Sequence, residues 1–316
     1  MINGIHHITA LASDPQRNAD FYTGVLGFRL VKRTVNFDAP DVYHLYYGDE
    51  IGQPGTILTF FPFPNAIRGK RGTGEISAVA FLVPREALGF WVERLSRNGI
   101  HLDGPFKRFG EEFIAFRDPD GMIVEIVFAD RYAAYRHWNE NSVPKEFAVR
   151  KLCGATMTLA TRDETDKMMR GQLGFRFADE RANRFRYLIG DNESEAAIDV
   201  VIDKTLPHNR QSAGSVHHIA WRVADDASQR HWRERLIGSG THVTEILDRQ
   251  YFRSIYFREP GGVLFEIATD APGFAVDESV QELGLHLKLP PWLEPERPKL
   301  ERILPPLELK KSSAIR

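Results

Sequence analysis

The chain has 316 residues, of which 42% are hydrophobic and 27% are charged, with a formal net charge of −2. This length predicts about two domains, and the near-neutral charge balance argues against a nucleic-acid partner or an anionic membrane surface. The single cysteine, Cys153, excludes an intramolecular disulfide framework, and with no signal peptide or apolar run of transmembrane length we expect a cytoplasmic protein without membrane partners.

The first part of the chain is predicted to form a strand, a helix and three further strands. Two adjacent histidines, His6 and His7, lie in the opening strand. Asp14 and Pro15 are typical of a helix N-cap and first turn, and Gly27 is expected to end the helix. The three extended stretches that follow cover residues 30–38, 42–47 and 56–61.

The same order of elements recurs three more times, which indicates an internal repeat. The expected helices of the later units cover residues 84–99, 163–173 and 225–237. The clearest of their expected strands cover residues 76–83, 113–116, 122–128, 251–257 and 263–269. The fourth unit opens, like the first, on two adjacent histidines, His217 and His218.

This repeat divides the chain into two pairs of units with a linker and a tail. We expect an N-terminal pair over residues 1–130, a linker over 131–150 and a C-terminal pair over 151–270. Residues 271–316 form a proline-rich tail, which is expected to wrap the surface or to meet a partner.

Aligning the four units gives two columns of residues. The opening strands contribute His7, Ala78, Ala155 and His218, and the last strands contribute Thr59, Glu125, Asp199 and Glu266. A single strand histidine is ordinarily a packing residue, and a carboxylate in an apolar strand needs a partner because burying a bare charge is unfavourable. The matched positions of His7, His218 and Glu266 therefore predict a metal site shared by units one and four. We expect units two and three to bind no metal, with Glu125 and Asp199 either in structural hydrogen bonds or as vestiges of a lost site.

Two imidazoles and one carboxylate are a chemically informative set. They leave open positions on a divalent ion, as in non-haem Fe(II) oxygenases, and they are also compatible with catalytic zinc. Because side chains alternate along a strand, His6 and His217 are expected to face away from His7 and His218, towards packing or hydrogen-bonding partners.

Several segments spread along most of the chain carry a resemblance to a known family. They are residues 4–9 (GIHHIT), 31–38 (VKRTVNFD), 41–46 (DVYHLY), 54–56 (PGT), 216–220 (VHHIA), 248–249 (DR), 260–266 (PGGVLFE) and 272–274 (PGF). They resemble the vicinal oxygen chelate superfamily, the fold of glyoxalase I and the extradiol dioxygenases, and more narrowly its hydroquinone-type ring-cleaving dioxygenases. The resemblance implies an α+β fold of four βαβββ modules in two tandem halves, with a metal cup formed by modules one and four.

The resemblance also implies roles for individual residues. His7, His218 and Glu266 match the metal ligands, and Tyr256 matches a catalytic tyrosine ten residues before the glutamate. Residues that match outer positions around the metal or substrate are Arg249, Thr9, His6 and His217. The implied metal is Fe(II), with Mn, Zn or Ni as alternatives in a purified or crystallised sample.

The implied activity is that of a non-haem Fe(II), extradiol-type ring-cleaving dioxygenase. Its partners would be O2 and a small hydroquinone- or catechol-type aromatic, and a homo-oligomer is a possible assembly of the chain. A glyoxalase-type isomerase or lyase is an alternative, although Thr59 stands where a fourth protein ligand would lie. A ligand-sequestering resistance protein on the same fold is another alternative, but it would not need the metal trio.

Overall fold

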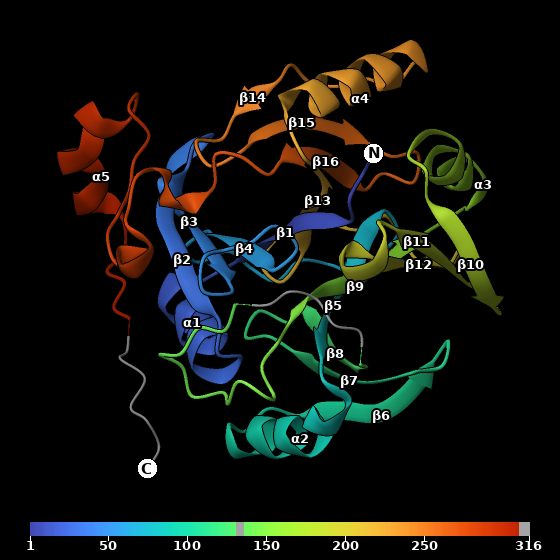
Figure 1. Ribbon diagram of the computed structural model, residues 1–316, viewed down its shortest axis with the longest axis horizontal. Helices are drawn as coiled ribbons and strands as arrows, with labels where there is room; N and C mark the ends of the chain where they lie inside the picture. The colour runs from blue at the N-terminus through green and yellow to red at the C-terminus, as the bar shows by residue number, and fades with distance from the viewer. Residues whose placement is uncertain (131–135, 310–316) are drawn as a thin grey trace.

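The structure is a computed structural model that describes residues 1–130 and 136–309. Two curled eight-stranded sheets make up most of the molecule (Figure 1). The strand orders are β14-β15-β16-β13-β1-β4-β3-β2 and β10-β11-β12-β9-β5-β8-β7-β6. This arrangement confirms the predicted α+β fold of paired βαβββ modules. The domain boundaries at residues 130, 150 and 270 stay a prediction.

The strands divide between the sheets by module. In the first sheet they are β1 (Ile5–Ala12), β2 (Arg29–Asn36), β3 (Ala39–Gly48), β4 (Ile57–Pro62), β13 (Val216–Val223), β14 (Leu247–Asp248), β15 (Arg253–Arg258) and β16 (Leu264–Thr269). In the second sheet they are β5 (Glu75–Val83), β6 (Leu102–Arg108), β7 (Glu111–Arg117), β8 (Ile123–Phe128), β9 (Lys151–Leu159), β10 (Arg176–Arg181), β11 (Arg184–Ile189) and β12 (Ala196–Ile202).

The helices are few and short, and they take up less of the described chain than the strands do. They are α1 (Pro15–Ala19), α2 (Leu88–Arg97), α3 (Asp163–Asp166), α4 (Asp226–Gly238) and α5 (Arg297–Ile303). Two of them continue as π-helical turns, α1 through Asp20–Val25 and α3 through Lys167–Gln172. Short 3-10 turns lie at Arg85–Ala87, Asn192–Ser194, Phe274–Val276, Val280–Glu282 and Glu294–Glu296. None of the helices in the described residues is long and apolar enough to cross a membrane.

The central pairing of the first sheet joins modules one and four. Strands β1 and β13 run antiparallel, with His7 opposite Ala220 and Thr9 opposite His218. In the second sheet β5 and β9 join modules two and three in the same way. Each sheet therefore combines one module from each predicted half of the chain. Modules one and four form the first sheet, and modules two and three form the second.

The two histidine strands do not alternate regularly, because each carries a β-bulge. The register between β1 and β13 shifts at His6 on one strand and at His217 on the other, so each of these residues is the extra one. A bulge re-aims neighbouring side chains. The Nδ1 atom of His6 consequently lies 2.9 Å from that of His7. The expectation that His6 and His217 face away from their neighbours is therefore wrong.

The ladder registers also correct one position in the aligned columns. Glu266 pairs with Ala220, two residues after His218, and Asp199 pairs with Thr156. The residue equivalent to the histidines in module three is therefore Gly154, not Ala155. A Cβ atom at Gly154 would lie 2.2 Å from the carbonyl oxygen of Ala197, so this position has no room for any side chain.

The described part of the tail, residues 271–309, packs along the open edge of the first sheet, beside β2 and β3 (Figure 1). The amide of Lys288 donates to the carbonyl of Arg33 at 2.9 Å, and the Arg33 guanidinium donates to the carbonyls of Leu285 and Leu307. The tail therefore covers a strand edge that would otherwise present unpaired backbone groups.

A buried ion cluster fixes the tail to β2. The Lys32 ammonium is fully buried and contacts Asp277 Oδ1 at 2.6 Å and the carboxylate of Glu278. Its charge also lies 4.9 Å from the centre of the Tyr251 ring, whose hydroxyl donates to Asp277. Removing one member of the cluster would leave the opposite charges buried without a partner, so we expect its loss to destabilise the fold.

We predict that Lys32→Met lowers the free energy of unfolding by about 3–5 kcal/mol, because it leaves two acidic groups without their cation in a buried site. Urea unfolding followed by circular dichroism measures the change. Lys299→Met is the matched control, because the Lys299 side chain is 63% exposed and pairs with Glu296 at the surface, where a change below about 1 kcal/mol is expected. Equal effects of the two substitutions would contradict the prediction.

Candidate metal centre

Two rows of side chains cross the inner face of the first sheet, because residues paired on neighbouring strands share a face. The threonine row consists of His218, Thr9, Thr59 and Tyr46, and the glutamate row consists of His7, Ala220, Glu266 and Tyr256. The rows lie side by side where β1 meets β13. The candidate centre is formed at this junction.

Three buried polar side chains converge there. The Nε2 atoms of His7 and His218 lie 3.4 and 2.9 Å from Oε2 of Glu266, and 3.3 Å from each other. The side chains come from β1, β13 and β16, and none of the three residues is more than 4% exposed. The structure thus brings together the three residues that the sequence columns paired, in an arrangement that could hold a metal ion.

The carboxylate of Glu266 supports the fit of a cation. Its Oε1 atom accepts a hydrogen bond of 2.5 Å from the Ser254 hydroxyl, whereas Oε2 is buried and has no hydrogen-bond donor. Burial acts to raise the pKa of Glu266, and positive charge at the positions of His7 and His218 lowers it well below its usual value, so the carboxylate is ionised when a cation stands beside it. An ionised oxygen buried without a donor is unfavourable, and a divalent cation at this point would relieve it.

The hydrogen bonds behind His7 show which of its nitrogens carries the proton. Nε2 of His6 lies 3.1 Å from the carbonyl oxygen of Thr269, which can only accept, so this nitrogen must carry hydrogen. Burial lowers the pKa of His6 well below its usual value, so its ring is neutral and its Nδ1 is an acceptor. The Nδ1 of His7 must then donate, so a metal-binding His7 would offer the lone pair of Nε2, the nitrogen that faces Glu266. Fixing a ligand's tautomer in this way is the usual task of an outer partner.

The second histidine pair repeats this contact. Nδ1 of His217 lies 2.8 Å from Nδ1 of His218, and burial lowers the pKa of His217 to about 3 and that of His218 below its usual value. Both rings are therefore neutral, and one of the two facing nitrogens must carry the shared hydrogen. With that hydrogen on His218 Nδ1, its Nε2 offers a lone pair to the centre.

The remaining predicted residues lie around this trio. Tyr256 is the ladder partner of Glu266, and its hydroxyl accepts a hydrogen bond of 3.2 Å from Nε of Arg249. Arg249 also pairs with Asp38 at 3.0 Å. The hydroxyl of Thr9 accepts a hydrogen bond of 2.9 Å from Thr59. Burial raises the pKa of Tyr256 well above its usual value, so its phenol stays protonated.

Four residues of the site escaped the sequence analysis. They are His44, Tyr46, Ser254 and Phe252. The ring of Phe252 packs 5.0 Å from the rings of both His6 and His7. Ser254 lies two residues before Tyr256, so period-two spacing along that strand was the signal that could have found it. His44 and Tyr46 lie two residues apart on β3, and the ladder pairing of Tyr46 with Thr59 brings them to the site.

Half-buried aromatic side chains lie near the trio. The His44 ring lies 4.3 Å from that of Phe61, which lies 5.9 Å from that of His217, and all three are partly exposed. On the opposite side Phe252 and Phe274 are buried in an apolar cluster.

The second sheet fills the equivalent position with arginines. The Arg108 guanidinium contacts both Glu125 and Asp199, and Arg186 binds Asp199 through Nε at 2.7 Å. Arg186 occupies the ladder position opposite Asp199 that Tyr256 occupies opposite Glu266. The expected structural hydrogen bonding of Glu125 and Asp199 is therefore confirmed.

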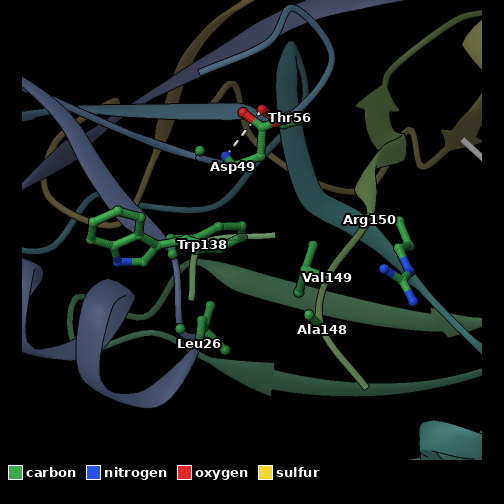
Figure 2. Close-up of a pocket in the computed structure, with 10 residues that line it drawn as sticks. Leu26, Asp49, Thr56, Trp138, Ala148, Val149 and Arg150 are labelled. Carbon is green, nitrogen blue, oxygen red and sulfur yellow. Dashed lines mark hydrogen bonds between the residues drawn. The ribbon is translucent and has the colours of Figure 1, made fainter. Parts of the chain in front are cut away.

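A small pocket beside Trp138 is separate from this centre (Figure 2). It is lined by residues that include Leu26, Asp49, Thr56, Trp138, Ala148, Val149 and Arg150. The Asp49 carboxylate accepts hydrogen bonds from the backbone and side-chain nitrogens of Gln53, at 2.9 and 2.7 Å. This carboxylate thus holds the loop after β3 in place, which is a structural task.

Comparison with known proteins gives results for nearly the whole chain. Residues 4–126 and 163–267 match the model of the family described as the Glyoxalase/Bleomycin resistance protein/Dioxygenase superfamily. A Bacillus subtilis relative with the provisional name ring-cleaving dioxygenase MhqO is 43% identical over 97% of both chains. The chlorohydroquinone/hydroquinone 1,2-dioxygenase of Sphingobium indicum is 38% identical over 96% of both chains.

Solved structures give the same result for the fold. The crystal structure of a provisionally named dioxygenase from Bacillus subtilis superposes with a TM-score of 0.92 at 41% identity, covering 98% of this chain and 99% of the other. Glyoxalase I from Zea mays superposes with a TM-score of 0.61 over 90% of this chain and 97% of the other. At 14% identity the second likeness concerns the fold alone.

The paired columns predict one divalent ion per chain in the first sheet and none in the second. Elemental analysis of the purified protein measures the content. Glu266→Ala removes the only carboxylate of the trio and should abolish binding, whereas Glu125→Ala removes a partner of Arg108 and should leave the ion in place. Metal that survives the loss of Glu266 and disappears with the loss of Glu125 would place the site in the other sheet.

Proposed function

The chain belongs to the glyoxalase/bleomycin resistance protein/dioxygenase superfamily, and we propose that it is a metal-dependent ring-cleaving dioxygenase that acts on a hydroquinone-type aromatic with O2. The observation that carries the proposal is the buried convergence of His7, His218 and Glu266 around a carboxylate oxygen with no hydrogen-bond donor. The 38% sequence identity with a chlorohydroquinone/hydroquinone 1,2-dioxygenase, over 96% of both chains, supports the substrate class.

In this proposal His7 and His218 hold the ion through Nε2, and Glu266 holds it through Oε2. The ion is Fe(II), because two histidines and one carboxylate with open positions are the ligand set of non-haem Fe(II) oxygenases; Mn, Zn or Ni could replace it in a purified sample. When bound, Fe(II) would supply open positions that bring an aromatic oxygen and O2 together, and the redox chemistry that couples them.

The surrounding residues would prepare the substrate. The Tyr256 oxygen accepts a hydrogen bond from Arg249, which leaves the phenol hydrogen free to be donated to a developing oxyanion of the substrate. The positive charge of Arg249 favours a deprotonated substrate oxygen nearby. His6 and His217 keep the lone pairs of the ligand histidines directed inwards. The rings of Phe61 and Phe252 would exclude water from the reacting atoms.

The geometry disfavours a glyoxalase-type lyase. Such an enzyme would use a fourth protein ligand at the position of Thr59, and the Thr59 hydroxyl is already bonded to Thr9 and to Nε2 of His44, at 2.9 and 2.8 Å. A ligand-sequestering protein would have no use for the buried trio.

Oxygen uptake tests the proposal directly. Protein purified without O2 and loaded with Fe(II) should consume one O2 for each substituted hydroquinone, with loss of the aromatic absorbance band. Glu266→Ala, given the same iron, should consume none. If the loaded wild-type protein consumes no O2 with any hydroquinone or catechol, the proposed function is wrong.

Tyr256→Phe should slow ring opening by about 10²–10⁴-fold, as expected for loss of a general acid, without changing metal content. The phenol acts on the substrate oxygens and not on the ion, so hydroquinone should still bind when O2 is excluded. Stopped-flow absorbance after mixing the preformed complex with O2 measures the step.

Tyr187→Phe is the matched control for this prediction. Its hydroxyl also accepts a hydrogen bond from an arginine Nε, that of Arg162 at 2.9 Å, but it lies in the second sheet. Its rate should equal that of the wild type. If Tyr256→Phe also turns over like the wild type at saturating O2, then Tyr256 is a packing residue.

A further inference from the structure

The two ladder rows of the first sheet are equivalent by position. Starting from His7, the glutamate row reaches Tyr256 in three ladder steps, and starting from His218, the threonine row reaches Tyr46 in three. Thr59 stands where Glu266 stands in the other row. Tyr46 is thus the counterpart, in module one, of the tyrosine proposed to act on the substrate.

The hydroxyl of each of these tyrosines is hydrogen-bonded to a side-chain nitrogen. The Tyr256 hydroxyl receives a hydrogen bond from Arg249, whereas the Tyr46 hydroxyl lies 2.8 Å from Nδ1 of His44. The other nitrogen of His44, Nε2, lies 2.8 Å from the Thr59 hydroxyl. The His44 ring is therefore fixed at both nitrogens, between a phenol and a threonine.

The direction of these hydrogen bonds can be followed from Thr59. Its hydroxyl donates to Thr9, so it must accept from Nε2–H of His44. Burial lowers the pKa of His44 well below its usual value, so the ring is neutral and its Nδ1 accepts the hydrogen of Tyr46. The phenol hydrogen is thereby used, and the Tyr46 oxygen keeps its lone pairs.

The two tyrosines thus offer opposite groups to a ligand. Arg249 can only donate, so Tyr256 retains a hydrogen to give, while Tyr46 retains an acceptor. Tyr46 is 1% exposed, lies on the inner face, and packs 6.4 Å from the Phe252 ring, which contacts His7. A hydroquinone would present a matching pair of groups, one oxygen that loses its proton at the metal and a second hydroxyl that keeps it.

We propose that Tyr46 binds the substrate by accepting a hydrogen bond from the hydroquinone hydroxyl that does not reach the metal, and that His44 positions Tyr46 for this contact. The inference rests on the proposed function. Through this contact the site would select a ring that carries a second hydroxyl away from the metal. A site built to bond a hydroxyl binds a ligand that lacks it less tightly, because the buried partner is then left unpaired.

Binding without O2 separates this contact from the chemistry. Dissociation constants of hydroquinone and of 4-methylphenol, which has a methyl group in place of the second hydroxyl, are measured by calorimetry on the metal-loaded protein. The wild type should prefer hydroquinone by about 3- to 10-fold, the range for one neutral hydrogen bond. Tyr46→Phe should abolish the preference and bind 4-methylphenol as the wild type does, which also shows that it is folded.

Variants of His44 test its positioning role. His44→Gln can still donate to Thr59 and accept from Tyr46, so it should keep most of the preference, whereas His44→Phe should lose it. Tyr43→Phe is the control on the same strand, because the Tyr43 hydroxyl donates to the carbonyl of Pro305 in the tail. It should bind both ligands like the wild type.

The outcomes distinguish this inference from the proposed function. A wild type that binds and cleaves hydroquinone but shows no preference, or a Tyr46→Phe variant that keeps the preference or weakens both ligands equally, overturns the role of Tyr46 alone. A preference lost in both His44→Gln and His44→Phe overturns the positioning role of His44. A wild type that binds neither ligand overturns the proposed function and this inference together.

Discussion

The antiparallel pairing of β1 with β13 is the constraint on which the candidate centre depends. It places His7 beside His218 although 211 residues separate them in the chain. The two parallel neighbours, β4 and β16, then bring Thr59 and Glu266 to the same face. A shift of one residue in the central ladder would turn the ligand side chains to the outer face, so the bulges at His6 and His217 must be conserved in any variant of the site that keeps its geometry.

The polar atoms behind the centre are satisfied, and this directs the remaining lone pairs inwards. Ser254 bonds one oxygen of Glu266, and the carbonyl of Thr269 fixes His6 and through it His7. What is left is one carboxylate oxygen and two imidazole nitrogens facing each other. In the second sheet the same scaffold meets the same requirement differently, because Arg108 and Arg186 supply the positive charge that Glu125 and Asp199 need. Each sheet that buries acidic groups therefore needs positive charge beside them, supplied by arginines in the second sheet and by the proposed metal ion in the first.

The sequence predicts the architecture and the trio well because both depend on repetition. Matched spacings in four units bring His7, His218 and Glu266 into one column set, and the family resemblance identifies the fold. The bulges were not predictable from alternation, since a bulge arises from pairing between strands and not from the pattern within one. For the same reason the aligned columns placed Ala155 where Gly154 belongs. The roles of His44 and Tyr46 likewise emerge only when the ladder registers are known.

The presence of Thr59 where the other row has a carboxylate has an electrostatic consequence for the proposed metal site. Two neutral imidazoles and one carboxylate would leave a bound divalent ion with a net charge of +1, and the ion's own charge dominates such a site. A carboxylate at position 59 would cancel this charge and occupy a further coordination position. With Thr59 bonded instead to Thr9 and His44, the centre keeps both an open position and an attraction for an anionic oxygen. A phenolic substrate that releases its proton on binding satisfies both, and the same Thr59 hydroxyl sets the orientation of His44 and hence of Tyr46. Thr59, which stands where the other row has Glu266, therefore connects the chemistry of the metal side with the recognition of the distant hydroxyl.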